Sequence, residues 1–402
     1  MQRVSFVAGI AVVLVACSTP ASPAVESQST ALGSPTTDAL ASASATASPQ
    51  TAEGPRVTWS ELEFDGSIRD VVADGARFVA VGVGTEGASS WTSDDGRSWT
   101  EHDVPERVFG EIDEGTELTG TMGALVRLED TLYSFGGMAF MDAVAGAGWR
   151  WTDGDRWEVI HSTSPFFGGR VTAAVANGHS LVAATESFAA GLFGSYATWR
   201  WTPATRWNPT ALASSDEEDI TVSALAWSDG RFVATGSAAD AVEGVERWDW
   251  PRTLAMWTSP DGQSWRPVQP PADMSEICAV SSIGPGFVAL GVSSDRVAAW
   301  KSMDGSSWTR VTFDAPQGPF STAGMGCRVA DAGDGLVAFA SDADATMFWT
   351  SSDGDGWVFR ERLPIAMTAA AAQDGVLVVS GSTPGSAEPL TEQILYVGTI
   401  EP

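Results

Sequence analysis

Basic residues are scarce in this chain. Its 402 residues include 51 acidic groups but only 22 basic ones, Lys301 is the single lysine, and the formal charge is −29. A polyanion of this kind repels phosphate backbones, so we expect no nucleic-acid partner. We interpret the acidic surplus as a solvated, soluble surface, with an acidic patch for a cationic partner as the alternative.

Residues that carry chemistry in enzymes are also few. The spacing of the three histidines, His102, His161 and His179, matches neither a zinc site nor a motif that pairs histidine with a Ser or Cys nucleophile. The sequence has no aspartate-rich calcium loop and no glycine-rich phosphate loop. We therefore predict no metal and no cofactor, name no catalytic residue, and favour a protein that is not an enzyme.

The first residues are typical of a targeting segment. Arg3 precedes an apolar run over residues 4–16 that is too short to span a membrane stably. The sequence LVAC, ending at Cys17, resembles the bacterial lipobox, where a signal peptidase cleaves before a cysteine that becomes lipidated. This resemblance implies a signal peptide over residues 1–16, palmitate-type acyl chains on Cys17, and a protein anchored on the outer face of the cell membrane. A plain secretory signal with a chance cysteine is the alternative.

A low-complexity segment follows the lipobox. Residues 18–55 are almost wholly Ser, Thr, Ala and Pro, so they cannot bury enough apolar surface to fold. About 38 flexible residues would give an end-to-end distance on the order of 35 Å. We therefore predict a signal peptide at 1–16, a lipidated cysteine with a disordered tether at 17–55, and a folded domain at 56–402.

Tryptophans recur in pairs along the rest of the chain. In each pair the second tryptophan follows the first by eight residues, and the pairs are Trp91/Trp99, Trp149/Trp157, Trp199/Trp207, Trp257/Trp265, Trp300/Trp308 and Trp349/Trp357. The second members are separated by 58, 50, 58, 43 and 49 residues. Self-similarity at such a period is the signature of a repeat architecture.

Each repeat contains four short strand-like segments. In the fifth repeat these are EICAVSSIG, GFVALGV, VAAWKSMDG and SSWTRVTF, which are rich in Val, Phe and Trp and are separated by turn residues. No segment after residue 56 has a convincing helical period. Four antiparallel strands repeated around an axis form the blades of a β-propeller, so we predict an all-β fold of this kind.

The turn between the third and fourth strands carries a local motif. It appears as SDDGRSW from Ser93, SPDGQSW from Ser259, SMDGSSW from Ser302 and SSDGDGW from Ser351. Asp and Ser side chains bond backbone groups within such a turn, and Gly supplies its left-handed geometry. We expect the two flanking tryptophans to face one another across the hairpin as a cross-strand pair.

This motif resembles the BNR or Asp-box repeat of sialidase-like propellers, S-x-D-G-x-S-W. As architecture the resemblance covers residues 57–402; as a motif it covers four hairpins, and the box is degraded in the hairpins that end at Trp157 and Trp207. In these families the box lies on the outer rim and acts structurally. The resemblance thus implies turn-forming roles for four aspartates, Asp95, Asp261, Asp304 and Asp353.

The two ends of the chain together supply one more blade. Six hairpins suggest six blades, but residues 366–399 supply three further strands without a fourth. The segment RVTWSELEF from Arg56 matches the fourth strand of the other repeats, with Tyr396 in the place of the first aromatic and Trp59 in the place of the second. We therefore predict seven blades, the last one closed by the N-terminal strand.

Cys278 and Cys327 lie at the same place in adjacent repeats, 49 residues apart. Innermost strands of adjacent blades are neighbours, so a disulfide is expected in an oxidising exterior if the Cα atoms come within roughly 7 Å. Two buried free thiols are the alternative.

Propeller sites usually lie where the second strand connects to the third and one blade connects to the next. These connections are short in repeats one, five and six, and long in repeats two to four, where they include GGMAFMDAVAGAG, ESFAAGLFGSYA and SAADAVEGVERWDWPRTLA. Their aromatic residues could form an apolar recognition surface, namely Phe140, Phe166, Phe167, Phe188, Phe193, Tyr196, Trp248 and Trp250. Satellite cores beneath the same loops are the alternative.

A sialidase-like activity is the enzymatic alternative that the Asp-boxes imply. That family binds its substrate carboxylate with three arginines and uses a tyrosine nucleophile, and this sequence offers Arg69, Arg170, Arg328 and Tyr196. The arginine motif expected before the first box is absent. We therefore favour a monomeric, extracytoplasmic scaffold that binds an envelope protein or a cell-wall glycan, with a glycan-active hydrolase as the alternative.

Overall fold

The computed structural model describes β-strands between residues 56 and 401. The described residues are 56–85, 87–105, 120–140, 143–152, 155–160, 169–187, 198–202, 206–210, 212, 218–245, 250–314, 320, 326–342, 344–384 and 392–401. All 29 elements within these ranges are strands. No helix in the same ranges is long and apolar enough to cross a membrane.

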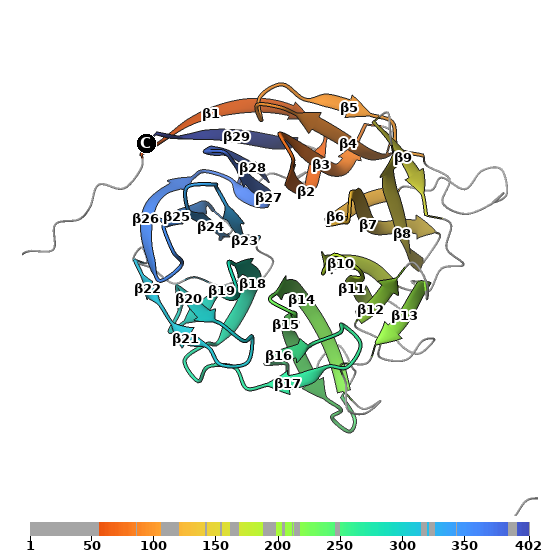
Figure 1. Cartoon of the computed structure of the whole chain (residues 1–402), viewed down its shortest axis with the longest axis vertical. Coiled ribbons are helices and arrows are strands. Elements are labelled where there is room, and N and C mark those ends of the chain that lie inside the picture. The colour runs from red at the N-terminus through yellow and green to blue at the C-terminus, as the bar shows by residue number, and fades with distance from the viewer. Residues whose placement is uncertain are drawn as a thin grey trace, which may run out of the picture. The chain divides into compact units, whose positions relative to one another are not determined.

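The strands form seven sheets arranged as blades around an axis (Figure 1). From the axis outwards, blade 1 holds β2 (Ser67–Asp74), β3 (Arg77–Gly84), β4 (Gly87–Ser93) and β5 (Thr100–His102); blade 2 holds β6 (Gly120–Leu128), β7 (Thr131–Phe140), β8 (Ala143–Thr152) and β9 (Arg156–Val159); blade 3 holds β10 (Gly169–Ala176), β11 (Leu181–Ser187), β12 (Thr198–Thr202) and β13 (Arg206–Thr210). Blade 4 holds β14 (Glu218–Ser228), β15 (Arg231–Asp240), β16 (Thr253–Ser259) and β17 (Arg266–Val268). Blade 5 holds β18 (Glu276–Ile283), β19 (Gly286–Ser293), β20 (Arg296–Ser302) and β21 (Thr309–Arg310).

The last two blades depart slightly from this pattern. Blade 6 holds β23 (Cys327–Asp331), β24 (Leu336–Ser341), β25 (Thr346–Ser351) and β26 (Gly356–Leu363), with the short β22 (Thr312–Phe313) added in parallel beside β26. Blade 7 holds β27 (Ala366–Gln373), β28 (Val376–Ser382), β29 (Glu392–Glu401) and β1 (Arg56–Asp65). Each innermost strand contacts the next one around the axis, and β27 contacts β2, so the ring is complete. The predicted seven-bladed propeller is confirmed.

The N-terminal strand closes blade 7 as predicted. Arg56 to Asp65 pair antiparallel with Glu401 to Glu392 over the full length of both strands. Tyr396 pairs with Val379 in the same way that Trp91 pairs with Ala80 in blade 1, so its place in the repeat is confirmed. Burial and a hydrogen bond to Glu61 raise the pKa of Tyr396 to about 12, which keeps the phenol protonated as the donor to this carboxylate.

The apolar core lies between adjacent blades. One cluster joins Val79 and Val81 of blade 1 to Met122 and Leu132 of blade 2, and every one of these side chains is at most 3% exposed. Because each blade buries its faces against two neighbours, no blade has a core of its own. Cooperative stability therefore depends on closing the ring.

The Asp-boxes form their turns through side-chain hydrogen bonds. Asp304 Oδ1 accepts from the backbone N–H groups of Ser306 and Ser307, both at 2.8 Å, and the Ser302 hydroxyl accepts from Gly305 N–H at 2.8 Å. Burial acts to raise the pKa of Asp304, but the donors from Ser307 and Ser306 outweigh it and hold that pKa well below its usual range. Asp95, Asp261 and Asp353 accept from backbone N–H groups of their own turns in the same manner.

The paired tryptophans do not face one another directly, which corrects the expectation from sequence. Trp91 pairs with Glu101 and Trp300 with Arg310, so the first tryptophan lies opposite a residue two beyond the second. The same offset occurs in blades 2 and 3, where Trp149 pairs with Val159 and Trp199 with Pro209, so it belongs to the hairpin register that all these blades share. The two tryptophans are diagonal neighbours rather than opposed ones.

The two tryptophans of a pair also have different hydrogen-bond partners. In three Asp-boxes the second donates its indole N–H to the glycine carbonyl of its own box, as Trp308 does to Gly305 at 3.1 Å, whereas the buried indole N–H of Trp265 has no partner within the described residues. In blades 2, 5 and 6 the first donates to the segment arriving from the preceding blade, as Trp300 does to Asp273 at 3.2 Å and Trp349 to the Asp314 carbonyl at 2.7 Å. In blades 5 and 6 one tryptophan thus secures the turn, and the other secures the connection between blades.

A β-bulge interrupts six of the seven innermost strands at the same place. In β27 the register shifts between Met367 and Ala369, which leaves Thr368 unpaired within its own sheet. Its hydroxyl bonds the Ile68 carbonyl of the next blade at 2.9 Å. In most blades a glycine on the second strand lets the bulged innermost strand of the same blade come close, since a Cβ at Gly236 would lie 1.8 Å from the Thr221 carbonyl oxygen.

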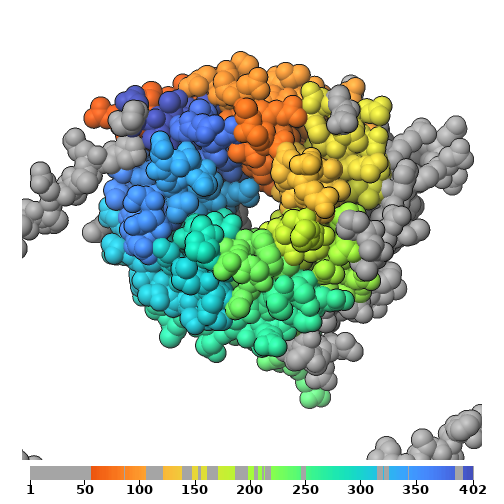
Figure 2. Space-filling view, viewed as in Figure 1, coloured from red at the N-terminus to blue at the C-terminus, as the bar shows by residue number. Residues whose placement is uncertain are grey.

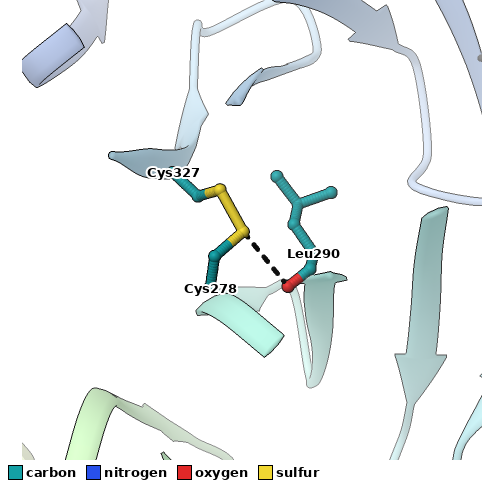
Figure 3. The surroundings of a disulfide bond; sticks show 3 residues. All are labelled: Cys278, Leu290 and Cys327. Carbon is teal, nitrogen blue, oxygen red and sulfur yellow. Dashed lines mark hydrogen bonds between the residues drawn. A yellow bond between two sulfur atoms is a disulfide. The ribbon is translucent and has the colours of Figure 1, made fainter. Parts of the chain in front are cut away.

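Cys278 occupies the bulge position of β18, and its sulfur is bonded to Cys327 of blade 6 (Figure 3). The two Cα atoms are 5.6 Å apart, within the range that a disulfide requires. Cys278 Sγ also lies 3.6 Å from the Leu290 carbonyl oxygen, but a bonded sulfur carries no proton, so this is a contact and not a donated hydrogen bond. The disulfide thus stands where Thr368 makes a hydrogen bond in blade 7.

We expect a Cys17→Ser variant to titrate no free thiol under denaturing, non-reducing conditions and two thiols after reduction. Replacing Cys278 and Cys327 by serine should lower the free energy of unfolding by about 2–5 kcal/mol, because the link restricts the unfolded chain. Chemical denaturation would measure this loss. Two reactive thiols before reduction would contradict the disulfide.

Candidate functional site

The seven innermost strands surround a cavity of about 920 Å³ at the axis of the ring. Figure 2 shows its opening at the centre of the propeller. Ala and Val side chains form much of its wall, and hydroxyl groups from the bulge positions, Thr172, Ser223 and Thr368, are added to them. Arg69, at the bulge of β2, also lines this channel.

One layer of the channel wall contains an ion pair. In five blades the residue that follows the bulge of the innermost strand is alanine. These residues are Ala124, Ala173, Ala224, Ala279 and Ala369. Blade 1 has Asp70 at this position, and blade 6, whose innermost strand has no bulge, has Arg328 at the equivalent position of its register. The Arg328 guanidinium reaches past the small Ala369 of blade 7 to within 3.5 Å of Asp70 Oδ1. The ion pair between Asp70 and Arg328 therefore depends on the small side chain of Ala369 in blade 7, which lies between blades 6 and 1.

Asp70 is held firmly by backbone donors. Its carboxylate accepts from Val71 N–H at 2.9 Å and from Leu125 N–H of blade 2 at 2.8 Å. Burial raises the pKa of Asp70, and the Arg328 charge and these donors oppose the shift. Arg328 is the more exposed partner, with 39% of its side chain accessible against 14% for Asp70. The arrangement offers a fixed acceptor and an accessible donor, which suits hydrogen bonding to a polar ligand.

Sequence reasoning named Arg328 only as one of several inner-strand arginines and did not identify Asp70. The signal that could have found the pair is the register of the inner strands. Aligning the repeats on their glycine-containing second strands places alanine at this position in five blades, and the two charged exceptions stand out. Arg170 lies in β10, where its side chain is outside the described residues.

Most of the predicted recognition residues are outside the described part of the chain. These are Phe166, Phe167, Phe188, Phe193, Tyr196 and Trp248, together with the predicted lipidation site Cys17. Phe140 ends β7 and pairs with Ala143 through its backbone. Trp250 is half-buried and donates its indole N–H to the Val245 carbonyl at 3.0 Å. Trp250 thus contributes to the structure of its own connection.

The structure corrects the predicted lengths of several connections. In blade 2, most of GGMAFMDAVAGAG is strand, because β7 and β8 extend to a two-residue connection at 141–142. A long connection also follows blade 5, which was expected to have short ones, since residues 314–326 join β22 to β23. Alanine and glycine in the blade 2 segment allow a continuous hairpin ladder that composition alone suggests is a loop.

The long connections leave the ring on one face. Because strands alternate in direction within a blade, the segment after the second strand and the segment after the fourth depart from the same end. Residues 103–119, 160–168, 188–197, 211–217 and 241–252 all join strand ends of this kind in or next to blades 2 to 4. The Asp-boxes lie at the opposite ends of the strands. Within the described residues, no three His, Cys, Asp or Glu side chains are grouped as a metal site.

Comparison with known proteins identifies the fold. No protein-family model matches the sequence, and no curated protein matches it. The β-propeller domain of Cps50 (Swd1) from Myceliophteria thermophila is 10% identical, with a TM-score of 0.50, and the match covers 85% of this chain and 99% of that one. The Dos1 propeller is 11% identical, with a TM-score of 0.50 and coverage of 86% and 95%. The phage phi92 endosialidase is 9% identical, with a TM-score of 0.48 and coverage of 87% and 70%. At these identities the likeness is one of fold alone.

Proposed function

We propose that the propeller is a binding scaffold, anchored outside the cell membrane by a lipid on Cys17, that presents one face to a partner protein of the envelope. The observation that carries this proposal is that the long connections in or next to blades 2 to 4 join strand ends on the same face of the ring. Those connections contain the aromatic residues of the predicted recognition surface, including Phe166, Phe167 and Trp248. Large apolar side chains on long connections are typical of protein-binding surfaces.

The ring supports this role by holding the strand ends that flank the connections at fixed positions. Neighbouring blades are joined by the disulfide of Cys278 and Cys327 and by hydrogen bonds from bulge residues, and the pairing of β1 with β29 within blade 7 joins the two ends of the propeller chain. A rigid scaffold reduces the entropy lost when a partner binds. The apolar run before Cys17 supports the lipid anchor. Cell fractionation tests this anchor, because Cys17→Ser should move the chain from the membranes to the soluble fraction.

Site-specific photo-crosslinking in cells tests the partner. We expect a crosslinker at position 167 and one at position 248 to capture the same envelope protein, because both belong to connections that leave the same face. Position 303 is the matched control, since Met303 is 60% exposed but lies in an Asp-box on the opposite face. Alanine at Phe166 and Trp248 together should abolish the product from position 167.

Two results would overturn the proposal. One is the absence of a product from both test positions, or the same product from position 303. The other is a product that resists proteases and is degraded by glycan hydrolases, because this would assign the face to a cell-wall glycan.

A further inference from the structure

A second cavity, of about 490 Å³, lies between blades 1 and 2 on the face opposite to the long connections. Tyr133 and Trp151 are half-buried and line it, together with charged side chains from the ends of β2, β3, β6 and β8. Its size lies within the usual range for small-molecule sites. Because these residues belong to strands and tight turns, their positions are set by the blades themselves.

This cavity lies where the repeat departs from its pattern. Four hairpins have serine two residues after the first tryptophan, but blades 2 and 3 have Trp151 and Trp201 there. These two tryptophans directly oppose Trp157 and Trp207, so the serine that begins an Asp-box has been replaced by an aromatic pair. The replacement forgoes the turn hydrogen bonds that serine makes in the other boxes. An aromatic surface has been added at this edge of the ring.

The Trp151 ring is held in place by its neighbours. Trp157 meets it at a ring-centroid distance of 4.9 Å in an edge-to-face arrangement, and His102 does so at 5.3 Å. The Arg77 guanidinium lies 5.6 Å from the ring centre, and Arg77 also bonds Asp155 at 3.1 Å. A preorganised ring loses little entropy when a ligand packs on it.

The charges around the cavity balance, in contrast to the acidic chain as a whole. Three aspartates, Asp74, Asp130 and Asp155, face three arginines, Arg77, Arg127 and Arg150. Arg127 pairs with Asp74, and Arg150 bonds Glu158 at 2.9 Å, so neither sign dominates. Such a lining favours a neutral ligand over an anion or a cation. Carboxylates accept hydrogen bonds and guanidinium groups donate them, and a hydroxyl group can satisfy both.

We propose that this cavity binds a neutral saccharide. A pyranose ring has apolar C–H faces that pack on aromatic rings, and its rim of hydroxyl groups can bond aspartate and arginine together. Tyr133 and Trp151 supply the aromatic surface, and the balanced charges supply the hydrogen-bond partners. The site is separate from the face assigned to a partner protein and does not depend on that assignment.

Calorimetric titration of the full chain tests the saccharide site. The probes are chitotetraose, cellotetraose, maltotetraose and mannotetraose, with tetragalacturonate as the acidic comparison, in a detergent without a sugar head group. At least one neutral probe should bind. Trp151→Ser, which restores the residue found in four other blades, should weaken binding by about tenfold or more, because an aromatic contact is lost.

Two further variants keep the test independent of folding. Arg150→Gln should also weaken binding, whereas Arg362→Gln should leave it unchanged, because Arg362 makes a similarly exposed ion pair, to Asp342 at 3.0 Å, in blade 6. The proposal is overturned if no neutral probe binds, if only tetragalacturonate binds, or if Arg150→Gln and a folded Trp151→Ser chain both bind as tightly as the natural chain.

Discussion

A chain that lacks residues 56–64 is expected to lose cooperative folding of the whole propeller. Those residues form nearly all of β1, which touches both neighbours of blade 7. Trp59 packs edge-to-face on Phe348 of blade 6 with ring centroids 5.7 Å apart, and Phe64 packs on Trp91 of blade 1 at 5.1 Å. The deletion also leaves the whole edge of β29 without a partner. Loss of the strand therefore opens both seams of blade 7.

The expected size of this effect follows from the side chains removed. Val57, Trp59, Leu62 and Phe64 all pack against buried clusters, and loss of a large core side chain costs about 2–5 kcal/mol. Four such losses are comparable with the roughly 5–15 kcal/mol that stabilise a typical domain. Circular dichroism and calorimetry should show either no cooperative unfolding transition or a melting temperature lowered by more than about 10 °C.

The matched control for this deletion removes nine residues from the predicted tether. Deleting residues 28–36 should leave the melting temperature unchanged, because that segment is rich in Ser, Thr, Ala and Pro and has little apolar surface to bury. A propeller that melts at its normal temperature without residues 56–64 would show that β1 is dispensable.

Gln393→Leu is expected to have the second-largest effect, at about 3–5 kcal/mol of unfolding free energy. Gln393 is 3% exposed and lies at the seam between blade 7 and blade 1. Its carbonyl oxygen accepts from Ile68 N–H at 2.8 Å and from the Ser380 hydroxyl at 2.7 Å. Its amide nitrogen donates to the Ser67 hydroxyl at 3.0 Å and to the Thr368 hydroxyl at 3.3 Å. One side chain thus uses its full hydrogen-bonding capacity.

Gln393→Leu retains most of the side-chain volume but removes the amide group. The buried polar groups that it bonds, including Ile68 N–H and the Ser380 hydroxyl, then lose this partner. An unpaired buried donor or acceptor costs more than a hydrogen bond contributes, which is why the expected loss is large. Denaturant titration would measure it. Gln263→Leu, on an exposed Asp-box turn, is the control and should change stability by less than about 0.5 kcal/mol. Equal stability of the two variants would exclude the proposed role of Gln393.

Local features of the propeller could be predicted from sequence because short-range forces determine them. The box around Asp304 forms its turn from residues two and three apart, so its motif indicates its geometry. The match of Trp59 and Tyr396 to the repeat predicted the closing strand, because register is repeated in every blade. The direct opposition expected of the paired tryptophans was wrong, since turn length and not spacing alone sets the cross-strand offset.

Features that depend on ring geometry could not be predicted in the same way. Asp70 and Arg328 meet only because seven blades bring blades 1 and 6 to either side of Ala369. The hydrogen bonds of Gln393 likewise join strands from opposite ends of the chain. The predicted recognition surface and the lipid on Cys17 stay predictions, because the residues that would show them lie outside the described ranges, apart from the backbone of Phe140 and the side chain of Trp250.

The pairing of Arg56 with Glu401 has a mechanical consequence. Any pull transmitted through the residues that precede β1 enters the ring at Arg56, at one end of its ladder with β29. The ladder that closes the ring is therefore also the first joint to carry tension, and its failure would release blade 7 before any other blade. Resistance to force and integrity of the circle are properties of the same ten residue pairs.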